Sequence, residues 1–243
     1  MSNLIIFLFA GHLVGDFLLQ NRDMAEAKSR VKTCLLHALI VASFTWLLIG
    51  AIYPKGVWLM VFLVFLTHLL IDTLKSFDKH ESVRTFLVDQ AAHGLVLIII
   101  AGLFSQMSYA CIWLHWIPMY MPFLIIIIGL VLCIWFGSVL ISRAMAPITL
   151  ELQEELSTGL KNGGRWIGQL ERALTYLLVL SGNSGAIGFL FTAKSILRFG
   201  EIKKSGQRKE AEYIIIGTFM SFGWALLVAI SIQKWLSSLQ MVK

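Results

Sequence analysis

Apolar runs of about 20 residues recur along this chain, and they limit its possible folds more than any other feature. A helix of that length crosses the hydrocarbon core of a bilayer, where each backbone polar group must be paired within the segment. Only 14% of the residues are charged, whereas a soluble domain has about 25%. We therefore predict an all-α, polytopic transmembrane helical bundle with six spans, at residues 4–20, 34–52, 57–75, 86–104, 122–141 and 213–235.

Basic residues between the spans predict the orientation, because Lys and Arg gather on the cytoplasmic side. The connection after the first predicted span is rich in them, with Arg22, Lys28, Arg30 and Lys32. The connection after the second span holds only Lys55, and the one after the fourth span holds none. This alternation predicts that the N-terminus lies outside and that the first and third connections face the cytoplasm.

A further apolar segment, residues 170–197, is interrupted by Ser-Gly-Asn-Ser-Gly at residues 181–185. Glycines permit a tight turn at such a break. Basic residues stand on both sides of the segment, so a single crossing would violate the charge rule. We expect a hairpin that either enters the membrane and returns or lies on the cytoplasmic face. Its charges, including Glu171, Arg172 and Lys194, are expected to form caps or interhelical salt bridges.

Histidine and aspartate form a duplicated pattern in the first four spans. Both copies read H-x3-D-x20-H, and they are offset by 56 residues: His12, Asp16 and His37, then His68, Asp72 and His93. Each copy covers two spans, so residues 1–104 are predicted to be a core of two related hairpins and residues 105–243 a second part. The second copy has Asp89-Gln90 where the first has Thr33-Cys34.

Spacing and depth predict that these side chains meet. Residues four apart lie on the same face of a helix. At a rise of about 1.5 Å per residue, the four histidines and three aspartates all fall in the cytoplasmic half of a ~30 Å core. Ionisable groups at such depth usually face the protein interior and mark function.

This combination of ligands suits a divalent metal such as zinc, manganese or iron. The candidate ligands are His12, Asp16, His37, His68, Asp72 and His93, and Asp89 is the candidate general base or third carboxylate. Gln20, Lys28, Lys75 and Gln90 are candidates for supporting the ligands or contacting a substrate. Haem is disfavoured, because histidines that bind haem do not require a carboxylate one helical turn away, and haem would therefore leave the aspartates of the pattern unexplained. A proton relay and purely structural interhelical contacts remain open alternatives.

The same residues carry a family resemblance. The segment His12-Leu13-Val14-Gly15-Asp16, with His37, His68-x3-Asp72-x2-Lys75 and Asp89-Gln90-x2-His93, resembles domain of unknown function 3307, a bacterial membrane family. The resemblance covers about the first half of the chain. More loosely, the pattern is similar to the predicted membrane-bound metal-dependent hydrolases of bacteria. These resemblances imply an inner-membrane location and favour a metal, without naming a substrate.

The resulting functional hypothesis is a hydrolase that cleaves a phosphate or ester bond in a lipid-linked substrate. A proton-coupled transporter or permease is the main alternative, and a structural membrane scaffold is the third. Membrane lipids and an anionic small molecule are the expected partners, and no nucleic acid is expected. Gly11 and Gly15 form a small-xxx-small pattern beside His12, which favours close packing with a neighbouring helix.

Overall fold

The structure is a computed structural model that describes residues 2–20, 31–53, 55–76, 82–105, 110–111, 117–151, 162–199 and 208–241. Nearly all of these residues are helical, which confirms the predicted all-α class. The chain divides into two compact units, Met1–Val131 and Leu132–Lys243, called unit 1 and unit 2. The division falls inside the fifth predicted span.

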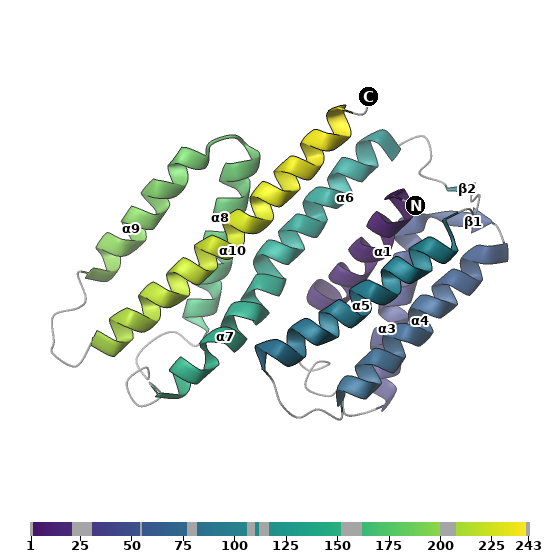
Figure 1. The fold of residues 1–243 in the computed structure, drawn as a ribbon, viewed down its shortest axis with the longest axis horizontal. Helices are drawn as coiled ribbons and strands as arrows, with labels where there is room; N and C mark the ends of the chain where they lie inside the picture. Colours follow the sequence, from purple (N-terminus) through teal and green to yellow (C-terminus); the bar gives the residue numbers. More distant parts are fainter. Residues whose placement is uncertain are drawn as a thin grey trace. The chain divides into compact units, whose positions relative to one another are not determined.

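Unit 1 is a helical bundle whose ribbon is shown in Figure 1. Its helices are α1 (Ser2–Val14), the π-helical turn η1 (Gly15–Leu19), α3 (Val31–Ile49), α4 (Lys55–Ser76), α5 (Val83–Leu103) and α6 (Ile117–Val131). Helix α1 packs against α3, α5 and α6, while α4 packs against both α3 and α5. The four helices of the duplicated pattern therefore surround one interior. A short antiparallel pair, β1 (Ala51–Tyr53) and β2 (Ala110–Cys111), joins two of the connections.

Local signals in the sequence set the ends of these helices. Ser82 caps α5: its Oγ accepts a hydrogen bond from the Thr85 backbone N–H at 3.1 Å. Thr85 Oγ1 accepts one from the Ser82 N–H in return, which completes a capping box. This cap fixes the start of α5 and hence the depth of Asp89 and His93. At the end of α3, Gly50 has a φ of 61°, a left-handed conformation that glycine adopts readily.

Among the described residues, five helices are long and apolar enough to cross a membrane: Lys32–Ile49, Gly56–Ser76, Val83–Leu103, Met119–Thr149 and Ala211–Leu239. They correspond to the second to sixth predicted spans. The first predicted span forms a shorter apolar helix, Asn3–Leu19. The last two spans are longer than predicted, because their helices continue through polar residues at the ends. These helices are those of a multi-pass membrane protein.

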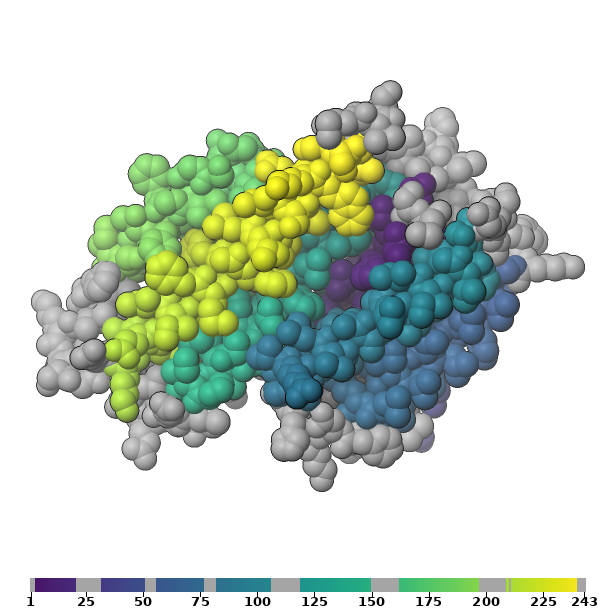
Figure 2. Space-filling view, in the orientation of Figure 1, coloured from purple at the N-terminus to yellow at the C-terminus, as the bar shows by residue number. Residues whose placement is uncertain are grey.

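The side chains of unit 1 are distributed as lipid surroundings require. Helices α4 and α5 lie at the surface of unit 1 in the space-filling view of Figure 2. Large apolar side chains are exposed on both of them, among them Leu66 and Leu70 on α4 and Leu95 on α5. The four histidines of the duplicated pattern are at most 3% exposed. Helices that face lipid are expected to bury their polar groups and to expose their apolar ones.

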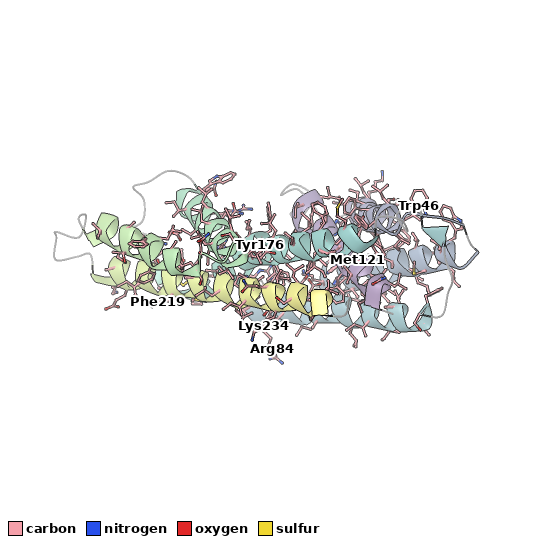
Figure 3. All side chains as sticks on the ribbon, turned by 90° about the horizontal axis from the view of Figure 1, so that it is seen from above. Trp46, Arg84, Met121, Tyr176, Phe219 and Lys234 are labelled. Atoms are coloured by element: carbon pink, nitrogen blue, oxygen red, sulfur yellow. The ribbon has the colours of Figure 1, made fainter. Side chains whose placement is uncertain are left out.

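Unit 2 consists of η3 (Leu132–Phe136), α7 (Gly137–Glu151), α8 (Gly163–Leu180), η4 (Ser184–Ala186), α9 (Ile187–Phe199) and α10 (Arg208–Met241). Helix α8 packs against η3 and α10. The chain turns back between α8 and α9 at the predicted break, where Gly182 has a φ of 76°. Figure 3 labels two contrasting side chains of this unit: Tyr176 is buried, and Phe219 is largely exposed.

Helix α8 is also polar on its buried face. Glu171, Arg172 and Thr175 are buried, whereas Leu170 and Leu177 are exposed. The expected salt bridge forms between Glu171 Oε2 and Lys194 Nζ of α9, at 2.7 Å. Arg172 instead donates hydrogen bonds to neutral acceptors, namely Ser221 Oγ, the Ile134 carbonyl and Ser138 Oγ. Helix α8 thus buries part of its charge and exposes large apolar side chains.

Candidate metal centre

Four helices of unit 1 bring all seven histidines and aspartates of the predicted site into one cluster. Helix α1 carries His12 and runs into η1, where Asp16 lies, while α3 carries His37. Helix α4 carries His68 and Asp72, and α5 carries Asp89 and His93. Each of the seven side chains is at most 8% exposed. The two copies of the pattern therefore form one site.

The close approach of α1 and α3 depends on two glycines. A Cβ on Gly11 would overlap Thr45 of α3, and one on Gly15 would lie 2.6 Å from Val41 Cγ2. Any larger residue at either position would push the helices apart. The small-xxx-small pattern therefore does serve helix packing, as predicted, and this packing brings Asp16 next to His37.

Asp16 is the carboxylate at the middle of the cluster. Its Oδ1 lies 3.2 Å from His37 Nε2, 3.3 Å from His68 Nε2 and 3.7 Å from His12 Nδ1. Only the contact with His37 has hydrogen-bond geometry. The Oδ2 of Asp72 lies 3.7 Å from both His37 Nε2 and His68 Nε2. Both aspartates therefore face imidazoles of the other copy as well as their own.

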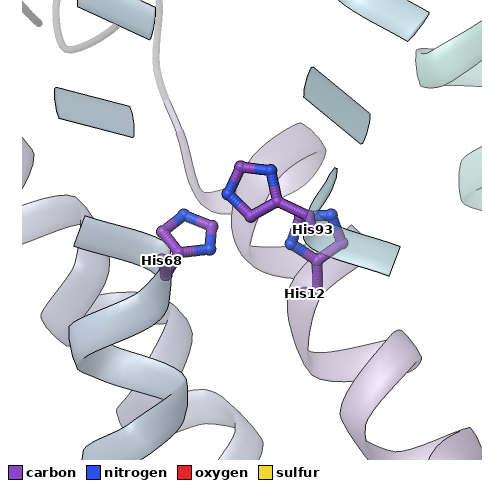
Figure 4. Close-up of side chains that lie close together, drawn as sticks. All are labelled: His12, His68 and His93. Carbon is purple, nitrogen blue, oxygen red and sulfur yellow. The ribbon is translucent and has the colours of Figure 1, made fainter. Parts of the chain in front are cut away.

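The imidazole rings lie against one another, and three of them are shown in Figure 4. The rings of His12 and His93 are stacked with centroids 4.8 Å apart and an interplanar angle of 20°. His68 lies 4.5 Å from His93 and 5.0 Å from His37, measured between ring centroids. Four imidazoles in one buried cluster are an unusual concentration of metal-binding groups in an apolar interior.

Several buried ring nitrogens have no hydrogen-bond partner among the described residues: His12 Nδ1, His37 Nδ1, His68 Nε2 and His93 Nε2. For His93 the tautomer follows from the geometry. Its Nδ1 lies 3.0 Å from the carbonyl oxygen of Asp89, which can only accept, so Nδ1 carries the hydrogen. The Nε2 lone pair of neutral His93 is then available to a ligand. Leaving such buried polar atoms unpaired costs about 1–3 kcal/mol each.

Three groups in the described residues have ligand atoms close enough to hold one metal ion. They are His12, His68 and His93; Asp16, His37 and His68; and Asp72, Asp89 and His93. Within each group, one ligand atom per residue lies within 4.8 Å of the others. The donors are imidazole nitrogens and carboxylate oxygens, which suit zinc, manganese and iron. The residues thus fit a divalent metal.

A small cavity lies beside the three histidines of the first group. Its other walls are apolar, formed largely by aliphatic side chains such as Val41, Val64 and Leu97. It has room for about one water molecule. Thr67 also lines it, but Thr67 Oγ1 donates to the Leu63 carbonyl at 2.7 Å. The aliphatic wall was not anticipated from the sequence, because apolar residues in a span carry no signal that separates cavity from packing.

Of the four predicted supporting residues, Gln90 and Lys75 contact aspartates of the cluster. Gln90 Nε2 donates to Asp16 Oδ2 at 3.4 Å and to Asp89 Oδ2 at 3.2 Å, so it links the first helix to the fourth. Lys75 Nζ lies 2.5 Å from Asp89 Oδ2, and its side chain is 32% exposed. Gln20 ends η1 and is half-buried. Lys28 lies outside the described residues.

The π-helical form of η1 was missed by the sequence reasoning. Asp16 is the second residue of this turn, which begins at Gly15. A π-helical turn widens the helix by one residue and often occurs at functional sites. Here it changes the direction in which Asp16 projects from α1. The glycine was the only hint in the sequence, and it is not specific.

Comparison with known proteins bears on the same part of the chain. No curated protein and no solved structure matches it. Residues 4–121, which include every member of the cluster, match the family described as "Protein of unknown function (DUF3307)". This family is the one that the histidine and aspartate pattern resembles. Residues 4–121 of the chain are therefore similar to the DUF3307 family.

Proposed function

We propose that unit 1 holds a divalent transition metal and that this centre hydrolyses a phosphate or ester bond in a lipid-linked substrate. The observation that carries the proposal is the group of three buried nitrogens, on His12, His68 and His93, that have no hydrogen-bond partner in the described part of the chain. In a purely structural cluster these nitrogens would pair with donors or acceptors of neighbouring helices. The same three histidines form one of the groups whose ligand atoms are close enough to hold one metal ion.

The proposed ligands are His12, His68 and His93, with Asp16 as the fourth. His37 donates to Asp16 and holds its orientation. The carbonyl of Asp89 does the same for His93 by accepting from its Nδ1. Such partners fix the tautomer and direction of a ligand, and they are a regular feature of metal sites in proteins.

A divalent metal with an open position supplies Lewis-acid activation of water and of a phosphoryl or ester oxygen. The chain's own groups supply the rest. Asp89 is the candidate general base, since its Oδ1 accepts no hydrogen bond from any residue that the structure describes. The side-chain amide of Gln90 donates a hydrogen bond to each of the Asp16 and Asp89 carboxylates and so fixes their positions. The aliphatic cavity wall keeps bulk water away from the reacting group.

The proposed location is the bacterial inner membrane, with the centre in the cytoplasmic leaflet. Asp16, Asp72 and Lys75 all lie near the C-terminal ends of their helices, and Asp89 lies near the start of α5. These helix ends adjoin connections that are basic in sequence, which is typical of the cytoplasmic side. Basic groups at that face also attract phosphate-bearing lipid head groups.

Metal analysis tests the proposal. The full chain is purified in mild detergent without a histidine tag, incubated with zinc, manganese or iron, freed of loose metal, and analysed for bound elements. We expect near-stoichiometric metal in the parent and loss of it in His12→Ala and His68→Ala. The control is Thr45→Ala on α3, which removes a buried polar atom outside the cluster. A folded parent that retains no metal would overturn the proposal.

The transporter alternative has its own support, because the rings of His37, His68, His93 and His12 form a continuous series. Such a series with carboxylates beside it could pass protons. Flux measurements in reconstituted vesicles separate the two functions. Proton flux in the parent that disappears in Asp16→Asn, in a protein without tightly held metal, would favour the relay.

A further inference from the structure

The second copy of the duplicated pattern carries an ion pair that the first copy lacks. With the offset of 56 residues, Lys75 takes the place of Leu19, and Asp89 takes the place of Thr33. The two charged residues lie on different helices, α4 and α5, and Lys75 Nζ is 2.5 Å from Asp89 Oδ2. Both copies have their histidines and aspartates without this pair. The asymmetry points to a role for the pair apart from the duplicated ligands.

Lys75 is the charged contact of Asp89 that can be reached from outside the bundle. Its side chain is 32% exposed, whereas the side chain of Asp89 is 4% exposed. Lys75 lies in the last turn of α4, and Arg84, which is exposed, lies in the first turn of α5. These two helices pack against each other, and a short connection joins them. An anionic group that approaches this end of the hairpin therefore meets cations before it meets the buried carboxylate.

Asp89 can release the ammonium and still keep a hydrogen-bond donor. Gln90 Nε2 donates to the same oxygen, Asp89 Oδ2, at 3.2 Å. Lys75 is at the end of a flexible chain of four carbons, so its ammonium can turn from one acceptor to another. An ammonium also has three donors, of which one carboxylate oxygen takes one. Lys75 is thus suited to bind an anion from outside the protein.

The same ion pair lies beside a proposed metal ligand. The other oxygen of Asp89, Oδ1, is 3.7 Å from His93 Nδ1, so one carboxylate separates Lys75 from this imidazole. A phosphate group suits such a place, because it has several charged acceptor oxygens that can contact an ammonium and a metal together. A neutral carboxylic ester offers no charge for the ammonium to bind.

The surface around the pair is apolar. Leu74, which precedes Lys75, is 62% exposed, and Val88, which precedes Asp89, is also 62% exposed. Leu87 is 44% exposed on the same helix as Val88. Large apolar side chains beside a cation at the end of a spanning helix are suited to a molecule with acyl chains and an anionic head group.

We propose that Lys75 binds the phosphate group of the substrate and thereby selects a lipid phosphate monoester over a neutral ester. Asp89 holds the ammonium when no substrate is bound, and the phosphate competes with this carboxylate for it. The inference rests on the proposed function and specifies its substrate class.

Binding of phosphatidic acid tests the inference. The zinc-loaded full chain in mild detergent is titrated with short-chain phosphatidic acid, with the matched diacylglycerol and with inorganic phosphate, and zinc per chain is measured for each variant. We expect the parent to bind phosphatidic acid about tenfold or more tightly than either other ligand. Lys75→Met should lose about tenfold or more of this affinity, whereas Lys75→Arg should keep it within about threefold. The matched control is Lys194→Met, which removes the lysine of the Glu171 ion pair in unit 2 and should bind like the parent.

Two further variants separate phosphate contact from charge balance. Lys75→Met leaves the Asp89 carboxylate without its cation, and this charge alone would repel a phosphate. Asp89→Asn removes the competing carboxylate, so phosphatidic acid should bind several-fold more tightly than it does to the parent. Lys75→Met combined with Asp89→Asn has neither charge, and its affinity should stay about tenfold below that of the parent. Parental affinity in this double variant would overturn the inference, because Lys75 would then only screen Asp89.

The possible failures are distinguishable. Equal affinity of the zinc-loaded parent for phosphatidic acid and diacylglycerol would refute the selection of phosphate and leave the metal function intact. Equal binding of phosphatidic acid by the parent and Lys75→Met would refute the role of Lys75. Inorganic phosphate that binds as tightly as phosphatidic acid would refute the lipid source. A folded parent that retains no zinc would refute the proposed function, and the inference would fall with it.

Discussion

Gly15 allows α1 to pass close to α3, and its replacement by alanine tests whether this contact sets the geometry of the cluster. A Cβ at residue 15 would lie 2.6 Å from Val41 Cγ2 and 3.2 Å from Val41 Cβ. Carbon atoms pack at about 3.5–4.0 Å, so the new methyl group would be roughly 1 Å too close. Val41 is fully buried, and the cavity that it lines has room for only about one water molecule, so it has little space in which to turn away.

The expected loss of stability follows from two opposing effects. Overpacking a buried position costs about 1–3 kcal/mol, while alanine in place of glycine in a helix returns up to about 1 kcal/mol. The net loss then lies between about zero and about 3 kcal/mol, with a middle value of about 1.5 kcal/mol. The shift also separates Asp16 from His37, whose atoms are 3.2 Å apart. Metal affinity should then fall by roughly tenfold or more.

The measurement is a double-mutant cycle of unfolding free energy in mild detergent, with Gly15→Ala, Val41→Ala and the double variant. Val41→Ala removes the Cγ2 atom that the new methyl group meets. The two substitutions should therefore be coupled favourably, by about 1 kcal/mol. Additivity within about 0.5 kcal/mol would refute the argument that this contact sets the helix spacing.

Three other predictions follow from single contacts. Gln90→Leu removes the donor shared by Asp16 and Asp89, and zinc affinity measured by competition with a chelator should fall about 10–100-fold. Arg172→Met leaves its acceptors in unit 2 without their charged donor, and thermal unfolding should show a loss of about 1–3 kcal/mol with the metal content unchanged. Leu177→Cys, on the exposed apolar face of α8, should react in vesicles with a lipid-soluble thiol reagent and resist a water-soluble one; rapid labelling by the water-soluble reagent would contradict lipid contact.

The grouping of the histidines and aspartates could be predicted because it depends on local spacing. A histidine and an aspartate four residues apart share a helix face, and short connections place neighbouring spans side by side. Apolar residues on the remaining faces then direct the polar face inward. These rules place His12 with Asp16 and His68 with Asp72, and they require no knowledge of how the helices are rotated.

Contacts between distant helices could not be predicted in the same way. Gln90 reaches Asp16 across 74 residues of sequence, and this contact depends on the rotation and vertical offset of α5 against α1. The ion pair of Lys75 with Asp89 has the same origin. Sequence periodicity identifies the buried face of each helix, but not which residues of two faces come opposite each other.

The charges of unit 2 were predicted only in part, for a similar reason. The salt bridge of Glu171 with Lys194 matches the expectation for charges near the ends of a hairpin. Arg172 differs because its partners are neutral: it donates to the Ile134 carbonyl in the π-helical turn η3 and to serines on two other helices. Nothing in the sequence around residue 134 indicates a π-helical turn.

The most direct test of the central claim is X-ray absorption spectroscopy at the zinc edge of the zinc-loaded protein. We predict a first shell of nitrogen and oxygen only, with about three imidazoles at zinc–nitrogen distances of about 2.0–2.1 Å. The imidazole signal should decrease in His12→Ala and His93→Ala. A sulfur shell at about 2.3 Å, or a zinc spectrum unchanged in both variants, would contradict a metal centre at the histidine cluster.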